Sequence, residues 1–357
     1  MFPRRLDRMT KNDPQASDLP PGATATTPWS MPKAAWYKVF KRVWVMTGFH
    51  ELGLLSAGLA FYTFLAITPL IASTVMIYGL VGNVHTVSKQ MEKLAQVLPP
   101  DAAHVLETQL MQIVSTSSSV TGIALAIALL FAIFGGMRAA SGMISALNII
   151  NDERETRSIV ALYARAASLT LAAILIALTG VLAGGVFAWL QTQTSVYLGG
   201  ATQTLFKLLT WIAAIALGSA GFAIIMRYGP DRRPAKWRWL TPGSVVATLL
   251  WIVISFGFSL YVAYISDYNA MYGSLSAIVV FLMWLFLSAY GVLVGALLNA
   301  EIERQTYCDT TAGPARPPGE RGAVLADVVD DAVPSLRDLQ KRKARRADVE
   351  RKHATPD

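Results

Sequence analysis

Long apolar stretches separated by short polar ones dominate the middle of this 357-residue chain. A helix that crosses a membrane needs about 20 consecutive, mostly apolar residues. Six stretches meet that length, at approximately 52–81, 120–147, 161–190, 205–228, 243–265 and 274–300. The pattern therefore predicts an all-α membrane protein whose core is a six-transmembrane-helix bundle.

Two further segments carry helical patterns of their own. Residues 31–50 place Trp36, Phe40 and Trp44 on one stripe and basic residues elsewhere, which is typical of an amphipathic helix lying in the membrane interface. Between 82 and 119, two apolar stripes at helical spacing are separated by a Pro–Pro pair. They predict an external helical hairpin in the first loop, with a plain connecting loop as the open alternative.

Composition agrees with the membrane interpretation. Apolar residues make up 54% of the chain, charged residues 15%, and the mean hydropathy is +0.43. Residues 1–50 and 301–357 hold 33 of the 54 charged side chains, which leaves 21 among the 250 residues between them. A soluble domain has about one charged residue in four. We therefore expect a transmembrane domain at 51–302 between disordered cytoplasmic ends at 1–30 and 303–357.

The distribution of lysine and arginine predicts the orientation. Eight basic residues precede the first span, five lie at 227–238 between the fourth and fifth spans, and eleven lie in the tail. The third and fifth loops contain none. Because basic residues gather on the cytoplasmic side, both ends are predicted to be cytoplasmic. The first 30 residues lack the apolar run of a signal peptide, so the first span is expected to direct insertion.

Motifs in the second half of the chain, together with two earlier segments, resemble the YihY/BrkB family of bacterial inner-membrane proteins. The matching residues are LAFYTFLAITPLI at 59–71, Arg138 with Ala146, Leu147 and Asn148, then Pro230, Trp239, Pro242, Gly243, Ser255, Tyr261, Tyr268, Asn269, Tyr272–Ser274, Trp284 and the GAxxNxE motif at Gly295–Glu301. The similarity covers about residues 35–305. One position departs from the family pattern: Leu297 stands where the family often has a carboxylate.

The resemblance implies a six-helix protein of the bacterial inner membrane. Such proteins are described as transporters or virulence-associated factors, and the name ribonuclease BN has also been attached to them. The departure at Leu297 argues against carrying over a proton-relay role for that carboxylate.

An enzymatic function finds no support in the residues. Phosphodiester hydrolysis needs a metal site or an acid–base pair, and the four histidines, at 50, 85, 104 and 353, have no metal-ligand spacing. The acidic cluster at 152–155 lies beside two arginines and is interpreted as a solvated, ion-paired turn. One cysteine, Cys308, excludes an intramolecular disulfide. We therefore expect no catalytic site, metal or cofactor, and no nucleic-acid partner.

Arg138 is the most informative charged residue within a predicted span. It lies nine residues before Leu147, about 14 Å from the cytoplasmic end of its helix at 1.5 Å per residue. A deep arginine costs about 2.5–3.5 kcal/mol on insertion scales, so its side chain is expected to face the bundle or a wet cavity. It could hold an anionic headgroup, or it could be a structural arginine bonded to carbonyls or to Asn148.

The remaining candidates are polar or conformational. Asn148, Asn299 and Glu301 join Arg138 as a candidate substrate pathway. The candidate structural or gating positions are Pro69, Gly135, Gly136, Pro242, Gly243, Tyr272 and Gly273. Small residues allow close helix packing, and a proline within a span can bend it.

These residues favour a transporter or flippase of a lipid-like or amphipathic anionic solute, with membrane lipids as partners. A non-transporting membrane scaffold or envelope-associated factor is the alternative. A continuous polar cavity at Arg138 would favour transport, and a dry bundle with Arg138 bonded internally would favour the scaffold. The substrate, the coupling ion and the oligomeric state stay open.

Overall fold

The computed structural model describes residues 19–81, 122–194, 200–264 and 275–328 of the 357-residue chain. The described residues form helices and connecting segments, and within them the one β-type contact is an isolated bridge between Ala235 and Thr311. The all-α class predicted from the sequence is confirmed. The predicted external hairpin at 82–119 and the turn with Tyr272 and Gly273 lie outside the described residues.

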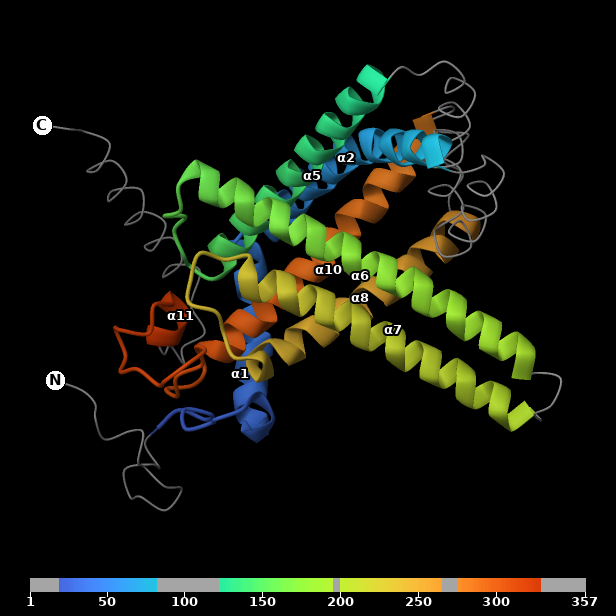
Figure 1. The fold of residues 1–357 in the computed structure, drawn as a ribbon. Helices are drawn as coiled ribbons and strands as arrows, with labels where there is room; N and C mark the ends of the chain where they lie inside the picture. Colours follow the sequence, from blue (N-terminus) through green and yellow to red (C-terminus); the bar gives the residue numbers. More distant parts are fainter. Residues whose placement is uncertain (1–18, 82–121, 195–199, 265–274, 329–357) are drawn as a thin grey trace, which may run out of the picture.

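Six long helices follow the six apolar stretches of the sequence (Figure 1). They are α2 (Leu52–Val81), α5 (Gly122–Ile150), α6 (Ile159–Thr194), α7 (Gly200–Tyr228), α8 (Trp237–Tyr264) and α10 (Ser276–Glu303). In their described residues, α6, α7, α8 and α10 are long and apolar enough to cross a membrane, and α2 makes a fifth span when it is taken together with α1 (Lys33–Phe49). The chain is thus a multi-pass membrane protein with four or five spans identified by length and composition.

The six long helices pack in a closed order, α2–α5–α6–α7–α8–α10 and back to α2. Of the four helices that each qualify as a span, α10 is the most buried, since buried residues make up 44% of its most apolar stretch against 6% for α6. Away from the end that carries the α5–α6 and α7–α8 loops, α6 and α7 diverge from α2 and α5 in the view of Figure 1. Their exposed apolar side chains are what a helix surrounded by lipid requires.

Helix α1 meets α2 at a bend of 64°. Glu51 between them has a φ of +53°, a left-handed conformation that ends α1 and redirects the chain. Tyr37, Phe40 and Trp44 on the outer face are exposed, as an interfacial helix needs. The opposite face is buried and includes Arg42, one of the basic residues that lie off the apolar stripe.

The segments at the two ends are more ordered than the sequence predicts. Residues 19–32, which include the short helix η3 (Pro28–Ser30), and residues 304–328, with helix α11 (Val324–Asp327), pack against the bundle. We name residues 304–328 the C-terminal strap. The prediction of disorder over 1–30 and 303–357 is wrong for these two described parts.

Long-range hydrogen bonds explain this order, and a compositional prediction cannot detect them. The amide of Tyr307 donates to Ala23 O over 2.8 Å, which ties the strap to the N-terminal segment. The amides of Lys236 and Ala312 donate to Thr310 O and Pro234 O, which tie it to the α7–α8 loop. Backbone N–H and C=O groups of the strap are therefore paired by hydrogen bonds to other segments, rather than within a long helix or a sheet.

Candidate functional site

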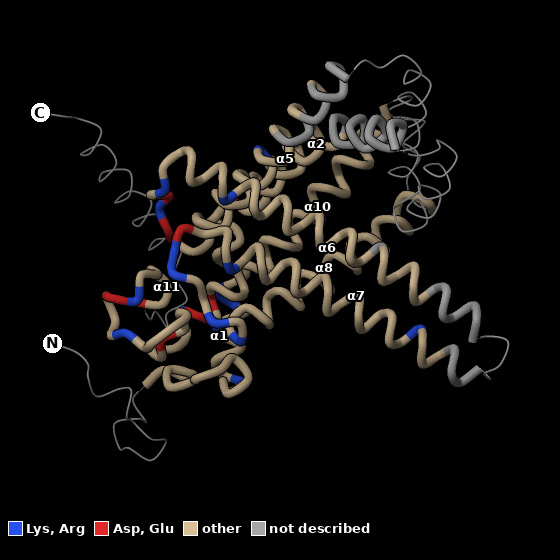
Figure 2. Tube along the Cα trace, viewed as in Figure 1, with Lys and Arg blue, Asp and Glu red and all other residues tan. Residues whose placement is uncertain are grey.

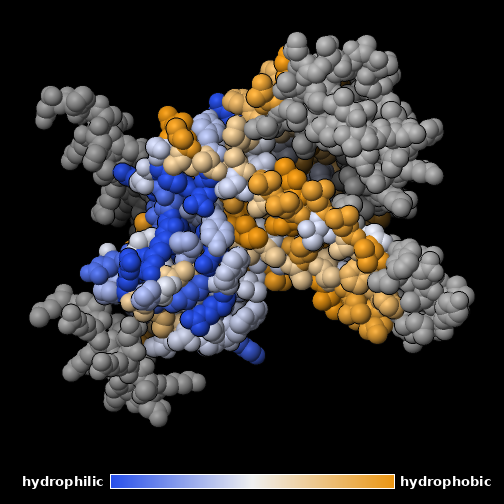
Figure 3. Space-filling view, in the orientation of Figure 1, coloured by the Kyte–Doolittle hydropathy of each residue, from blue (hydrophilic) through white to orange (hydrophobic). Residues whose placement is uncertain are grey.

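Most of the charged residues in the described part of the chain lie at one end of the bundle, which we call the polar end (Figure 2). Figure 3 shows the same division on the surface, hydrophilic over the loops and strap and hydrophobic over the long helices. This end contains the end of α5, the α5–α6 and α7–α8 loops, the start of α8, the end of α10 and the strap. It brings together Asn148, Asn299 and Glu301 of the predicted pathway, but not Arg138.

Arg232 and Glu303 form the first of two buried ion pairs. Arg232 Nη2 lies 2.6 Å from Glu303 Oε1, and its Nη1 donates to Glu303 Oε2 over 2.8 Å and to Asn151 Oδ1 over 2.9 Å. The Thr310 hydroxyl of the strap also donates to Glu303 Oε1. Burial by itself lowers the pKa of Arg232, but the charge and hydrogen bonds of Glu303 outweigh it and raise that pKa. Arg232 is therefore a permanent cation that joins the α7–α8 loop to α10 and to the start of the α5–α6 loop.

The second buried pair joins α1 to α10. Arg42 Nε lies 2.7 Å from Glu301 Oε2, its Nη2 donates to Glu301 O over 2.9 Å, and both side chains are 1% exposed. Arg304 lies on the other side, 3.9 Å from Glu301 and 2.9 Å from Asp152 Oδ2. Glu301 thus binds helix α1, and the α5–α6 loop is connected to the same cluster through Arg304.

Both candidate asparagines are occupied by structural hydrogen bonds. The Gly243 amide donates to Asn299 Oδ1 over 2.7 Å, and Asn299 Nδ2 donates to Leu240 O over 3.0 Å. Asn299 thereby pairs backbone groups in the first turns of α8, next to Pro242. Asn148 accepts the Asp231 amide over 2.7 Å and donates to Glu155 over 2.9 Å. Both side chains connect helices to neighbouring segments.

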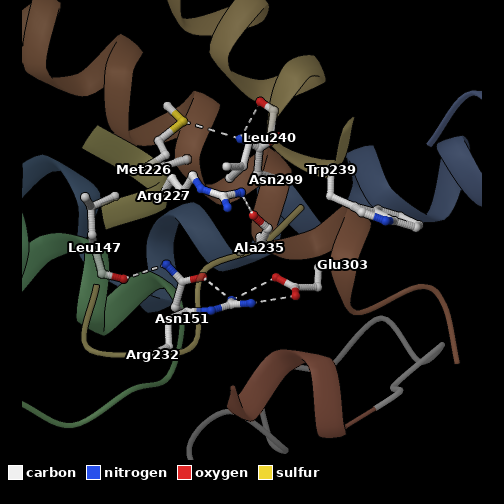
Figure 4. Close-up of a pocket in the computed structure, with 12 residues that line it drawn as sticks. Leu147, Asn151, Met226, Arg227, Arg232, Ala235, Trp239, Leu240, Asn299 and Glu303 are labelled. Carbon is white, nitrogen blue, oxygen red and sulfur yellow. Dashed lines mark hydrogen bonds and ion pairs between the residues drawn. The ribbon is translucent and has the colours of Figure 1, made fainter. Parts of the chain in front are cut away.

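A small cavity of about 20 Å³ lies among these groups (Figure 4). Its lining comes from α5, α7, the α7–α8 loop, α8 and α10. The residues are Leu147, Asn151, Met226, Arg227, Arg232, Ala235, Trp239, Leu240, Ala296, Asn299, Ala300 and Glu303. A space of this size holds about one water-sized particle, so it is not a passage for a lipid or a metabolite.

Arg138 lies apart from this cluster, on the outer face of α5. Its side chain is exposed, and its guanidinium carbon lies 5.1 Å from the ring centre of Phe134. Within the described part of the chain it has no ion pair and no side-chain hydrogen bond. The sequence predicts that Arg138 faces the bundle interior or bonds Asn148. In the structure its side chain lies on the outer face of α5 instead.

The candidate structural or gating positions also lie in different parts of the fold. Gly135 lies at the α2–α5 crossing, where an added Cβ would come within 2.8 Å of Ala66 Cα, while Gly136 faces Thr170 of α6. Gly243 lies at the α8–α10 crossing. Pro69 lies within the continuous helix α2, and the bend of that span is at residues 50–51 instead.

Several residues of the site escaped the sequence analysis. Arg232 belongs to a basic loop that the orientation rule alone explains, so nothing distinguished it from its neighbours. Arg42 did leave a signal, because it shares the 3–4 residue spacing of the buried Ala35, Val39 and Met46. Glu303 follows Asn299 by four residues and so lies on the same face of α10.

The strap contributes a pH-dependent element outside the spans. Burial by itself raises the pKa of Asp309, but hydrogen bonds from Thr311 and from the Arg316 amide outweigh it and hold the pKa below the ordinary value of 3.8. A carboxyl with a lowered folded pKa stabilises the fold above its ordinary pKa and loses this contribution as the pH falls through the folded value. We expect hydrogen-exchange protection of the Thr311 and Arg316 amides to be constant above pH 4 and to fall below it.

Asp309→Asn is the control for this prediction, because asparagine does not titrate. Its protection should be reduced at all pH values and should not change further on acidification. Glu153 accepts the Val324 amide over 2.8 Å, and burial raises the pKa of its carboxyl. Its contribution to folding stability is therefore largest below the ordinary pKa of 4.5 and declines as the pH rises. Protection of Thr311 that did not respond to acid would contradict the assigned role of Asp309.

The fold and the polar end define an α-helical, multi-pass membrane protein. A family model described as Virulence factor BrkB matches residues 43–320, so the chain belongs to that family. Among the described residues, no three histidine, cysteine, aspartate or glutamate side chains are arranged to hold a metal ion.

Three relatives share 25–28% of their residues with this chain over the matched lengths, and two of them are named membrane proteins. A UPF0761 membrane protein of Rhodospirillum centenum is 27% identical over 307 residues, which are 84% of this chain and 63% of the relative's length. The ribonuclease-like protein YfkH of Bacillus subtilis is 25% identical over 72% of this chain and 92% of its own. A UPF0761 membrane protein of Idiomarina loihiensis is 28% identical over 58% of this chain and 69% of its own. No solved structure matches the chain.

Proposed function

We propose that the protein binds anionic, amphipathic lipid at the outer face of α5 and moves it between the leaflets of the bacterial inner membrane. The observation that carries this proposal is Arg138, a cation exposed on an apolar helix face. Exposed Phe131, Phe134 and Ile149 share that face. A charged side chain next to hydrocarbon is costly unless it is paired, and a lipid phosphate supplies the missing partner.

The direction of the Arg138 side chain supports this role. Helical side chains tilt toward the N-terminus of their helix, and the contact with Phe134 shows that Arg138 follows this tendency. Helix α5 ends at the polar end, so the guanidinium is directed away from that end. It therefore does not relieve its charge by reaching the loops and their carboxylates.

Two serines extend the polar character of this face. Ser141 and Ser145 follow Arg138 at helical spacing, and Ser145 is exposed. Their hydroxyls donate to Arg138 O and Ser141 O, both over 3.0 Å, which leaves each oxygen free to accept. Together the three residues form a polar track about 10 Å long that leads toward the polar end. We propose that a headgroup follows this track at the protein surface while its acyl chains stay in the bilayer.

Movement of a headgroup along this track requires that α5 spans the membrane with its C-terminal end on the cytoplasmic side. We propose six spans with both ends and the polar end on the cytoplasmic side, in agreement with the basic residues of the α7–α8 loop and strap. We also propose that the role is not enzymatic and involves no cofactor and no nucleic acid. His50, the one histidine among the described residues, lies at the α1–α2 junction and not beside a group of carboxylates.

A lipid-movement measurement tests the proposal. The full chain is reconstituted in vesicles containing fluorescent phosphatidylglycerol or phosphatidylethanolamine, and movement is followed by chemical quenching of the outer leaflet. We expect faster movement of the anionic lipid and a loss of about tenfold or more in Arg138→Ala, because a hydrogen bond to a charged group contributes about 1.5–3 kcal/mol. Arg138→Lys should retain part of the activity.

Lys207→Ala is the matched control, since Lys207 is an exposed cation in another span, α7. It should move lipid at the rate of the unchanged protein. If the unchanged protein moves no lipid under any gradient, the flippase function is excluded. If Arg138→Ala inserts normally and moves lipid at the full rate, the role of Arg138 is excluded.

One observation favours the second function, a membrane scaffold. Three of the four predicted pathway residues, Asn148, Asn299 and Glu301, hold the polar end together through hydrogen bonds and ion pairs. A protein whose polar residues serve packing in this way is suited to present a fixed surface to a partner. Absence of lipid movement together with co-purification of a specific envelope protein would support the scaffold instead.

A further inference from the structure

We propose that the outer face of helix α1 is a docking surface that selects anionic lipid, such as phosphatidylglycerol, from the membrane leaflet at the polar end. In the proposed topology this is the cytoplasmic leaflet. The surface consists of Lys33, Tyr37, Phe40, Lys41 and Trp44, and we call it the α1 surface. It lies on a different helix from Arg138, and its binding of lipid does not depend on lipid movement.

Three large aromatic side chains of α1 are exposed although the helix packs against α10. Tyr37 is 70% exposed, Phe40 55% and Trp44 84%. They follow one another at spacings of three and four residues, so they lie on one face of the helix. A contiguous apolar patch of this kind marks an interaction surface, and tyrosine and tryptophan are enriched where a protein meets the membrane interface. The aromatic row therefore indicates contact with lipid.

The charge on the same face selects the kind of lipid. Lys33 and Lys41 are exposed and lie four residues before and after Tyr37, so they share its face. No aspartate or glutamate stands between Lys33 and His50, and neither lysine has an ion pair within the described part of the chain. Aromatic side chains beside lysines on an interfacial helix attract anionic headgroups as well as acyl chains. Neutral lipid would satisfy the aromatic row alone.

The buried face of α1 fixes the direction of these side chains. Ala35, Val39 and Met46 are buried, and on the same face Arg42 Nε lies 2.7 Å from Glu301 Oε2 of α10. A rotation of α1 that turned the aromatic row toward the bundle would take the buried Arg42 guanidinium away from its carboxylate, which is costly. The α1 surface is therefore held outward by the fold itself.

Helix α1 also has the direction that a helix lying on a leaflet needs. It meets α2 at a bend of 64°, and Figure 1 shows it at the polar end, running across the direction of α6 and α7. Because most of the charged residues lie at that end, it is where the lipid headgroups are expected. A helix in this direction presents its whole outer face to the headgroup region.

Quenching of a fluorophore on α1 by spin-labelled lipid tests the selection. Cys308, the only cysteine of the chain, is replaced by serine, and Gly48→Cys carries the fluorophore. Gly48 follows Trp44 by four residues, and an added Cβ there meets no atom within 4 Å. The full chain is reconstituted in vesicles with a small fraction of spin-labelled phosphatidylglycerol or spin-labelled phosphatidylcholine. We expect an apparent affinity about tenfold or more higher for the anionic lipid, and a smaller preference at high salt.

Three variants identify the residues responsible. The double variant Lys33→Gln with Lys41→Gln should lose most of the preference but keep quenching by both lipids, because the aromatic row is unchanged. Arg165→Gln removes an exposed cation of α6 and should keep the full preference. Arg138→Ala should also keep it, which distinguishes the α1 surface from the proposed lipid site on α5.

Three results would overturn the proposal. Equal quenching by the two lipids would mean that the α1 surface contacts the bilayer without selecting a charge. No quenching by either lipid would place this surface in water or against another protein. A full preference in the double lysine variant would mean that other basic residues attract the anionic lipid.

Discussion

Gly243→Ala is expected to destabilise the protein by about 3 kcal/mol or more, whereas Gly257→Ala on the same helix should be tolerated. At Gly243 an added methyl group would overlap the carbonyl oxygen of Gly295 and the side chain of Asn299. The obstacle is backbone, which cannot move aside as a flexible side chain does, so the cost lies at or above the usual 1–3 kcal/mol for overpacking. The added methyl group would also disturb the hydrogen bond from the Gly243 amide to Asn299.

Gly257 provides the control because an added Cβ there meets no atom within 4 Å. Alanine within a helix is favoured over glycine by about 0.5–1 kcal/mol, so Gly257→Ala should be neutral or slightly stabilising. Thermal unfolding of the detergent-solubilised variants, followed by circular dichroism, separates the two cases. Equal unfolding midpoints for both variants would show that α8 and α10 do not cross at Gly243.

Removing one partner of the Arg42–Glu301 pair is expected to have a comparable effect. Arg42→Met leaves the buried Glu301 carboxylate with the more distant Arg304, at 3.9 Å, as its cation, and Glu301→Gln leaves the buried Arg42 guanidinium without its carboxylate. Such changes cost about 3–5 kcal/mol because a buried charge loses its compensation. The expected result is a large fall in the unfolding midpoint, with loss of the α1–α10 contact detected by protease cleavage near α1.

The double variant Arg42→Met with Glu301→Met distinguishes the charge effect from simple loss of packing. An apolar pair of similar volume can replace a buried ion pair with little loss of stability, so the double variant should recover most of the midpoint. Arg157→Gln is the control in a more exposed pair with Glu155, whose side chains are 15% and 26% exposed. Arg157 also lies 3.6 Å from Asp231 and donates to Gly229 O over 3.0 Å, so its loss should cost more than that of an exposed pair but less than the loss of Arg42. A double variant less stable than either single variant would contradict this explanation.

The helices could be predicted from the sequence because the property that produces them is local. Lipid requires each spanning segment to satisfy its own backbone and to be apolar over about 20 residues, so α6, α7, α8 and α10 are visible in the order of residues alone. Family membership was equally accessible, since the motifs between Pro230 and Glu301 retain their order. The uneven distribution of charged residues likewise indicated that polar groups would gather outside the spans.

The candidate site was only partly predictable. Asn299 and Glu301 were identified as important polar residues, but their partners, Gly243 and Arg42, lie 56 and 259 residues away in the chain. No local pattern selects one such partner among many basic residues and amides. The packed strap and the segment at 19–32 were missed for the same reason, because their order depends on hydrogen bonds to each other and to the α7–α8 loop.

By itself the sequence determined the class of the protein, the extent of its apolar helices and its family, because each of these depends on local composition and motif order. The tertiary structure decided which charges are buried together, which glycines lie at helix crossings, and that Arg138 is exposed while Arg42 is buried. The physical reason is that lipid selects apolar segments one at a time. Ion pairing and close packing depend instead on which segments meet, and that is set when the whole chain folds.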